Sequence, residues 1–182
     1  MTSKPRPQLT HVGVFVRDIE RMTAFYRDVM GLTVTDQGDV SGDRKIVFMS
    51  NDPDEHHQFV LVSGRAAGEV MLAAQQLSFL VDTLDDVRTL HDKVSAAGME
   101  ITAQTCHGNA LSVYFKDPDG NRVEVYTHTP WHITQPHAVP IDLSQTDAEI
   151  LAWTEAHCRE DASFMSAEER SKQMAKLMGS AS

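Results

Sequence analysis

The chain has 182 residues, of which 41% are hydrophobic and 23% charged, and its formal net charge is −10. This balance is typical of a soluble globular domain with a substantial core. We expect no nucleic-acid or membrane partner, because the negative charge disfavours anionic surfaces and no apolar run approaches the roughly 20 residues of a membrane span.

The first part of the chain predicts a strand, a helix and three further strands. Residues 9–16 are apolar and rich in β-branched side chains, which is typical of a strand. Residues 17–31 predict a helix, with Asp18 as its N-cap and Gly31 at its end. Its apolar residues recur at helical spacing: Ile19, Met22, Phe25, Tyr26 and Val29. The three strands are expected at 32–36, 44–49 and 57–63.

The same order then repeats. Residues 76–81 predict a strand, and residues 81–99 predict a helix with Gly98 as its stop. The Asp-Pro-Asp-Gly sequence at 117–120 is a strong turn signal. The three strands of this second repeat are expected at 100–104, 110–116 and 121–127.

Two such repeats predict the fold class. We expect an α+β fold in which two βαβββ modules, at about 9–63 and 76–128, pair within one domain over residues 1–128. Each module alone would leave a sheet face uncovered. Their pairing would create a concave surface suited to a metal-sized cavity.

Residues 129–182 differ in character from the repeats. The first part is rich in Pro and His and predicts an extended segment. A helix is expected after Ser144, the predicted N-cap, with Asp147 three residues further on. A second helix is expected after Ser166, which forms a capping box with Glu169. We interpret 129–182 as a helical appendage that packs on the core or on a partner subunit, and expect a homodimer or a higher homo-oligomer.

Two features favour a cytoplasmic location. The N-terminus lacks the apolar segment of a signal peptide. The two cysteines, Cys106 and Cys158, are widely separated and show no CxxC spacing. Such thiols fit a reducing compartment better than a disulfide framework.

Three polar residues occupy related positions in the two repeats. His11 begins the first strand of the first module, and Gln76 stands at the equivalent place in the second. Glu124 lies in the last strand of the second module. Because side chains alternate along a strand, a His and a Glu from symmetry-related strands can face one cavity. These residue types are metal ligands, so the pattern predicts a metal site.

The sequence resembles a known superfamily. LTHVGVFVRDIERMTAFYRDVMGL, residues 9–32, is similar to the opening module of the vicinal-oxygen-chelate superfamily, which includes glyoxalase I, bleomycin-resistance proteins and type I extradiol dioxygenases. GNALSVYFKDPDGNRVEVYTHTPW, residues 108–131, resembles the closing module of the dioxygenase branch. The stretches HHQFVLV, from His56, and HGNALSVYF, from His107, strengthen the likeness to the ring-cleaving dioxygenases.

This resemblance implies a metal site with one departure from the dioxygenase pattern. Such enzymes hold Fe(II), less often Mn(II), by two His and one Glu. The first His matches His11 and the Glu matches Glu124, whereas the second His falls on Gln76. Glyoxalase I enzymes can use Gln at such a position, but their additional Glu ligand falls here on Val60. We therefore expect either a metal held by His11, Gln76 and Glu124, a weakened site, or a lost one.

The resemblance also implies catalytic residues and a reaction. His57 matches the acid/base beside bound O₂, while His107 and Tyr114 match groups that hydrogen-bond the substrate hydroxyl. The expected function is an extradiol dioxygenase that opens a catechol-type ring with O₂. Three alternatives stay open. The first is a non-oxidative metal enzyme of the same superfamily, such as an isomerase or lyase, and the second is a metal-free ligand-binding module similar to bleomycin-resistance proteins. The third is a structural or regulatory remnant with no small-molecule function, which little in the sequence favours. His128, His132 and His137 are candidates for a lid.

Overall fold

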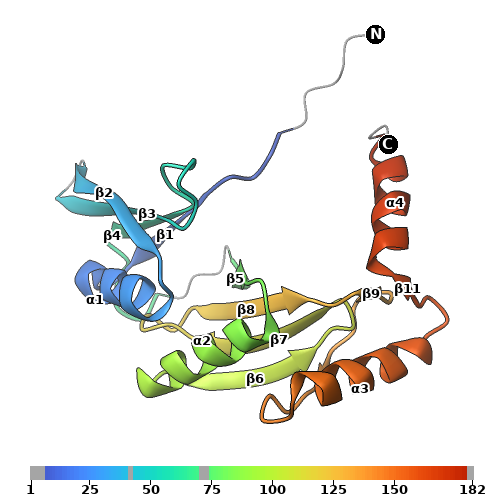
Figure 1. Ribbon diagram of the computed structural model, residues 1–182. Coiled ribbons are helices and arrows are strands. Elements are labelled where there is room, and N and C mark those ends of the chain that lie inside the picture. Colours follow the sequence, from blue (N-terminus) through green and yellow to red (C-terminus); the bar gives the residue numbers. More distant parts are fainter. Residues whose placement is uncertain (1–6, 41–42, 70–73, 180–182) are drawn as a thin grey trace, which may run out of the picture. The chain divides into compact units, whose positions relative to one another are not determined.

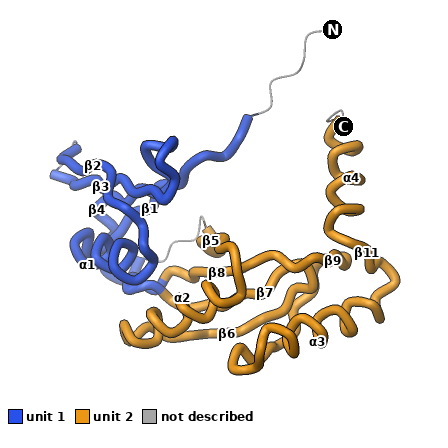
Figure 2. The backbone as a smooth tube through the Cα atoms, in the orientation of Figure 1, with its two compact units in different colours: residues 1–72, 117–120 blue, residues 73–116, 121–182 orange. Residues whose placement is uncertain are grey.

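The computed structural model describes residues 7–40, 43–69 and 74–179. The chain forms two units, coloured separately in Figure 2: residues 1–72 with 117–120 (unit 1), and residues 73–116 with 121–182 (unit 2). The first six residues, on which the expectation about a signal peptide partly rests, lie outside the described residues. Among the described residues, no helix has both the length and the hydropathy needed to cross a bilayer.

Unit 1 has the predicted order of strand, helix and three strands (Figure 1). Its elements are β1 (Val12–Val16), α1 (Ile19–Ala24), η1 (Phe25–Val29), β2 (Thr33–Val40), β3 (Arg44–Ser50) and β4 (Phe59–Ser63). The sheet order is β1-β4-β3-β2, with β1 parallel to β4 and the other neighbours antiparallel. Alternation along β1 buries Val14 and Val16 and leaves Phe15 exposed.

The first predicted helix is confirmed in its position and its caps. The Asp18 side chain accepts the backbone N–H of Arg21 at 2.9 Å, and Gly31 follows the helix with φ +81°. The sequence pattern does not reveal a change of helix type in the second half. From Phe25 to Val29 the backbone is a π-helix, in which the N–H of Met30 donates to the carbonyl of Phe25 at 3.2 Å.

The turn at residues 117–120 forms as predicted. The N–H of Gly120 donates to the carbonyl of Asp117 at 2.8 Å. The Tyr26 hydroxyl donates to Oδ2 of Asp117 at 3.0 Å, and the N–H of Arg17 donates to Oδ2 of Asp119 at 2.7 Å. These bonds tie the turn to the helix and first strand of unit 1.

Unit 2 repeats the architecture, which confirms the predicted α+β fold class with its two modules. Its module contains β5 (Leu77–Leu80), α2 (Leu84–Ala96), β6 (Ile101–Cys106), β7 (Ala110–Lys116) and β8 (Arg122–His128). A short strand, β10 (Val139–Pro140), extends the sheet to the order β10-β6-β7-β8-β5. The parallel pair β5–β8 corresponds to β1–β4 of unit 1. A capping box between Thr83 and Asp86 starts α2.

The C-terminal segment is helical, as predicted. It contains β9 (Trp131–His132), α3 (Asp147–Arg159), β11 (Met165–Ser166) and α4 (Ala167–Leu177). The predicted capping box of Ser166 and Glu169 is confirmed for α4. Ser144 as the cap of α3 was wrong: Thr146 caps that helix and forms a capping box with Glu149. Arg88 takes the carboxylate of Asp147, the partner expected for Ser144.

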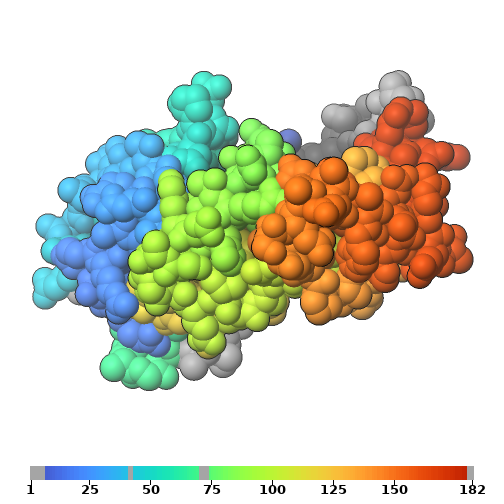
Figure 3. All heavy atoms as spheres, turned by 60° about the horizontal axis from the view of Figure 1, so that its bottom comes forward, coloured from blue at the N-terminus to red at the C-terminus, as the bar shows by residue number. Residues whose placement is uncertain are grey.

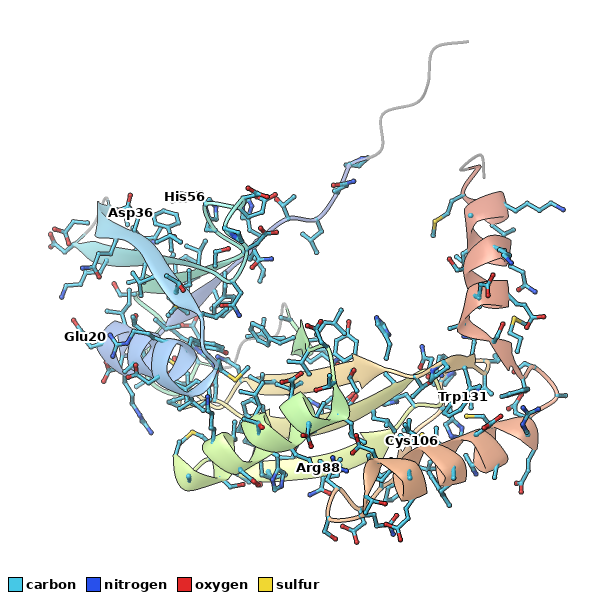
Figure 4. The ribbon with its side chains drawn as sticks, viewed as in Figure 1. Glu20, Asp36, His56, Arg88, Cys106 and Trp131 are labelled. Carbon is cyan, nitrogen blue, oxygen red and sulfur yellow. The ribbon has the colours of Figure 1, made fainter. Side chains whose placement is uncertain are left out.

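Helix α3 packs within unit 2, whereas α4 makes few contacts. Arg88 of α2 donates to the carbonyls of Leu143 and Gln145 at 2.8 and 2.7 Å, and Figure 4 shows it beside the start of α3. In Figure 3 the orange atoms of the α3 region lie against the green atoms of the second module. Cys106 and Cys158 are buried free thiols. Helix α4 buries no residue and leaves Leu177 and Met178 exposed.

Candidate active site

The carboxylate of Glu124 is the centre of a polar cluster in unit 2. Glu124 lies in β8 and is only 7% exposed. The strand register places Ser78 of β5 on one side of it and Tyr114 of β7 on the other. Because paired residues on neighbouring strands point to the same face, the three side chains meet.

Four donors satisfy this carboxylate. Oε1 accepts the hydroxyls of Tyr114 at 2.5 Å and Ser112 at 2.8 Å. Oε2 accepts the hydroxyl of Ser78 at 2.6 Å and the Nε2 amide hydrogen of Gln76 at 2.8 Å. A carboxylate has about four lone-pair positions, so each oxygen is fully occupied.

This environment sets the charge of the cluster. Burial raises the pKa of Glu124, but the hydrogen bonds from Ser78, Tyr114 and Ser112 outweigh it and hold that pKa below its usual value. Burial and the neighbouring Glu124 carboxylate raise the pKa of Tyr114 well above its usual value. At neutral pH the pair is therefore a carboxylate and a protonated phenol.

Gln76 precedes β5 and shares a face with Ser78, two residues further on. Its Nε2 donates to Oε2 of Glu124 at 2.8 Å and to Oγ of Ser78 at 2.9 Å. The Ser78 hydroxyl has a single hydrogen, which it gives to Glu124. It can therefore only accept from Gln76, and this fixes the amide with its nitrogen toward the carboxylate.

His107 extends the cluster from the loop between β6 and β7. Its Nε2 lies 2.9 Å from the Tyr114 hydroxyl and 3.8 Å from Oε1 of Glu124. Its Nδ1 lies 2.7 Å from the backbone carbonyl of His137. A carbonyl can only accept, so Nδ1 carries a hydrogen. In a neutral imidazole the lone pair is then on Nε2, the atom that faces the Tyr114 hydroxyl.

Unit 1 brings His11 and His57 together. His11 precedes β1, and its ring centroid lies 4.5 Å from that of His57. The N–H of Val12 donates to the carbonyl of Gln58 at 3.1 Å, which holds the two segments side by side. The predicted strand starting at residue 57 begins instead at Phe59, so His57 lies in the preceding loop. Burial, with the charges of His11 and His56, lowers the pKa of His57.

Val60 stands where the resemblance predicts the additional glyoxalase ligand. It pairs with Gly13 across β4 and β1, and its apolar side chain is buried. A valine has no donor atom for a metal. The departure from the glyoxalase ligand set therefore holds at this position.

Gln76 and Glu124 together have donor chemistry that fits a divalent metal ion. Carboxylate and amide oxygens are ligands of such ions. Nε2 rather than Oε1 of Gln76 faces the carboxylate, so the amide would have to turn for its oxygen to bind. Ser78, Ser112 and Tyr114 would remain to orient Glu124 as outer-shell partners do. The side chains of Gln76 and Glu124 therefore fit a metal ion, which would have to displace the hydrogen bond between them.

Within residues 7–40, 43–69 and 74–179, no three His, Cys, Asp or Glu side chains gather to hold a metal ion. The predicted ligand set contains only two residues of these types, since the third is Gln76.

The structure adds residues that the sequence predictions missed. Ser78 and Ser112 contact Glu124 directly, and both could have been found from strand alternation, because they lie two residues from Gln76 and from Tyr114. Gln135 and the His137 carbonyl hold His107, and no sequence pattern signals a contact between such distant segments. His137 contributes through its backbone, whereas its predicted role was in a lid.

The two βαβββ modules, each with its first and last strands parallel, are those of the vicinal-oxygen-chelate class. The chain belongs to the Glyoxalase/Bleomycin resistance protein/Dioxygenase superfamily, whose profile matches residues 8–125. The match covers the first module and the second up to Val125 within β8, and it ends before the C-terminal segment.

Single proteins of known name share only modest sequence identity with this chain. Biphenyl-2,3-diol 1,2-dioxygenase 3 of Rhodococcus globerulus is 32% identical over 128 residues, which cover 65% of this chain and 62% of that protein. The chain thus spans less than two thirds of this relative. A glyoxylase/bleomycin resistance protein/dioxygenase domain from a Frankia species superposes with a TM-score of 0.58 at 18% identity, covering 69% of this chain and 100% of that domain.

A fosfomycin resistance protein, FosX from Listeria monocytogenes, is also similar in fold. Its structure with Mn(II) and sulfate superposes with a TM-score of 0.52 at 18% identity, covering 71% of this chain and 95% of FosX. At such identities the two solved structures support the fold alone.

Proposed function

We propose that this protein is a divalent-metal-dependent dioxygenase that opens a catechol-type ring beside its two hydroxyls. The sequence relative named as a biphenyl-2,3-diol dioxygenase supports the reaction class. The observation that carries the proposal is the hydrogen-bonded chain from His107 through Tyr114 to Glu124. It joins a metal-type carboxylate to two groups that can exchange protons with a phenolic substrate.

Gln76 and Glu124 are the residues of unit 2 that would hold the metal, and His11 remains the ligand predicted by the sequence. When bound, Fe(II), or alternatively Mn(II), would supply a template for the diol and O₂ and a route for electrons between them. Both oxygen atoms of O₂ enter the product, so the reaction needs no external reductant.

The protein groups would manage protons. A catechol must lose a proton to bind as a monoanion, and His107 and Tyr114 form a hydrogen-bonded pair that can hold it. The high pKa of Tyr114 keeps its phenol protonated, so it can donate a hydrogen bond to a substrate oxygen. The lowered pKa of His57 keeps its imidazole neutral near pH 7 and able to accept a proton.

A second function is favoured by one contact. The Gln76 amide fills the lone pair of Glu124 that a metal would need. A metal-free module that binds its ligand reversibly, similar to bleomycin-resistance proteins, would keep the hydrogen bond from Gln76 to Glu124 intact. A non-oxidative metal enzyme is the third alternative and is separated from the dioxygenase by O₂ consumption.

One experiment distinguishes the three functions. Purified protein is loaded anaerobically with Fe(II), its metal content is measured, and O₂ uptake is followed with a panel of catechols. Stoichiometric iron with catechol-dependent uptake is expected, and Glu124→Gln should abolish both. Glu100→Gln is the matched control, because Glu100 is exposed and paired with Lys116. Iron without uptake would favour the non-oxidative enzyme, and a folded protein that binds no metal would favour the binding module.

A further inference from the structure

The C-terminal segment reaches the polar cluster through one side chain. Gln135 donates from Nε2 to the backbone carbonyl of His107 at 2.6 Å and to Oδ1 of Asn109 at 3.4 Å. Its Oε1 accepts the backbone N–H of His137 at 3.0 Å. One amide thus joins the loop of residues 107–109 to the strap of residues 135–137.

This junction determines which acceptor faces the imidazole of His107. With the strap in place, the carbonyl of His137 lies 2.7 Å from Nδ1. We infer that Gln135 is a positioning residue, which holds the strap so that Nδ1 of His107 stays protonated. Residues 135–137 lie beyond the superfamily match at 8–125, and their contacts with His107 bring the C-terminal segment to the polar cluster.

The other neutral tautomer of His107, with its hydrogen on Nε2, would satisfy the hydrogen bonds of the cluster. Without the His137 carbonyl, a neutral His107 would carry its hydrogen on Nε2 and donate it to Tyr114. Tyr114 could then donate to Glu124, and every contact of the cluster would be satisfied. The Nε2 lone pair would be lost, and with it the ability of this atom to accept a proton. The strap therefore selects the tautomer that leaves Nε2 available.

Helix α3 contacts the strap through His137. Nε2 of His157 lies 3.2 Å from Nε2 of His137, and the ring of Trp153 stacks on His157 with an interplanar angle of 4°. Ile133, just before the strap, is 1% exposed. These contacts give the predicted appendage a structural link to His107.

The test uses the full-length protein without substrate. Histidine is labelled with ¹⁵N, the His107 signals are assigned by their absence in His107→Asn, and spectra are recorded at about pH 8, above the ordinary titration range of histidine. We expect a protonated Nδ1 in the native protein. Gln135→Ala should move the proton to Nε2.

Two further variants keep the result interpretable. Gln135→Glu has the same shape and can accept from His137 but cannot donate to His107, so it should also shift the tautomer. Gln173→Ala, on the exposed face of α4, should leave the spectrum unchanged. An unprotonated Nδ1 in the native protein, an unchanged Gln135→Ala spectrum, or the same shift in Gln173→Ala would overturn the inference.

The value of this tautomer for catechol chemistry rests on the proposed function, but the measurement does not. If the protein consumed no O₂, the tautomer result would stand. If the tautomer were wrong, ring cleavage would still be possible.

Discussion

The Gln76 amide and the Glu124 carboxylate are joined directly, with Nε2 of Gln76 donating to Oε2 of Glu124 at 2.8 Å. Glu124 is thereby satisfied by protein groups alone. Metal binding must replace this bond, so the affinity depends on how well the Gln76 oxygen performs as a ligand. Imidazole is a stronger ligand for Fe(II) than an amide oxygen.

Gln76→His should therefore strengthen anaerobic binding of Fe(II) by about tenfold, which corresponds to about 1.4 kcal/mol. Gln76→Ala should weaken it, because the loss of a ligand outweighs the loss of a competing hydrogen bond. Titration calorimetry measures both affinities. Gln75→Ala, a change of the exposed neighbour, is the control and should have no effect. Tighter binding by Gln76→Ala would mean that Gln76 only competes with the metal.

Tyr114→Phe tests the proton path. The change removes the hydroxyl that lies 2.5 Å from Glu124 and 2.9 Å from His107. If the dioxygenase proposal holds, kcat for catechol cleavage should fall about 100-fold, the low end of general acid–base contributions. Steady-state O₂ uptake measures this. Tyr126→Phe should change kcat little, because the Tyr126 hydroxyl makes neither contact. An unchanged kcat in Tyr114→Phe would remove Tyr114 from the mechanism.

The sequence predicts the modules and the central residues of the cluster because both follow from regular patterns along the chain, namely the alternation of side chains in strands and the spacing of apolar residues in helices. The repeat makes Gln76 the equivalent of His11, strand alternation directs Gln76 and Glu124 to one face, and the structure joins these two side chains. Ser78 follows from the same alternation but carries no family signal. The contact between Gln135 and His107 spans 28 residues and depends on how the C-terminal segment folds back, which no local period records.

Helix boundaries show a different limit of the sequence. Ser144 with Asp147 and Thr146 with Glu149 both fit the spacing of a capping box. Tertiary contacts decide which of the two residues caps the helix. Arg88 binds Asp147, the partner that Ser144 would need, and donates to the carbonyl of Gln145. The π-helical half of the first helix is likewise invisible in the apolar spacing, because the burial of Phe25 and Tyr26 also fits an amphipathic α-helix.

Thr146→Ala and Ser144→Ala test this assignment as a pair. Thr146 accepts the N–H of Glu149 at 3.3 Å, and Glu149 accepts the N–H of Thr146 at 2.9 Å. Thr146→Ala should lower the free energy of unfolding by about 1 kcal/mol. Ser144→Ala should leave it nearly unchanged. Thermal or urea unfolding measures both changes. A larger loss of unfolding free energy in Ser144→Ala than in Thr146→Ala would support Ser144 as the N-cap, as the sequence predicted.

Gly108→Ala tests the packing of the C-terminal segment on the loop that carries His107. Gly108 has φ +79°, and a Cβ built on it would lie 2.5 Å from Cγ1 of Ile133 and 3.3 Å from Sγ of Cys158. Gly120 has nearly the same φ, +80°, but a Cβ there would meet nothing within 4 Å. Both substitutions strain the backbone, and only Gly108→Ala adds a collision.

Gly120→Ala should therefore lower the free energy of unfolding by about 1 kcal/mol, and Gly108→Ala by about 3 kcal/mol or more. Urea unfolding measures the difference. Because the collision would push Ile133 away from the loop, Gly108→Ala should also disturb the strap that follows it and shift the His107 tautomer. Equal losses in the two variants would show that the C-terminal segment does not pack against the loop of His107.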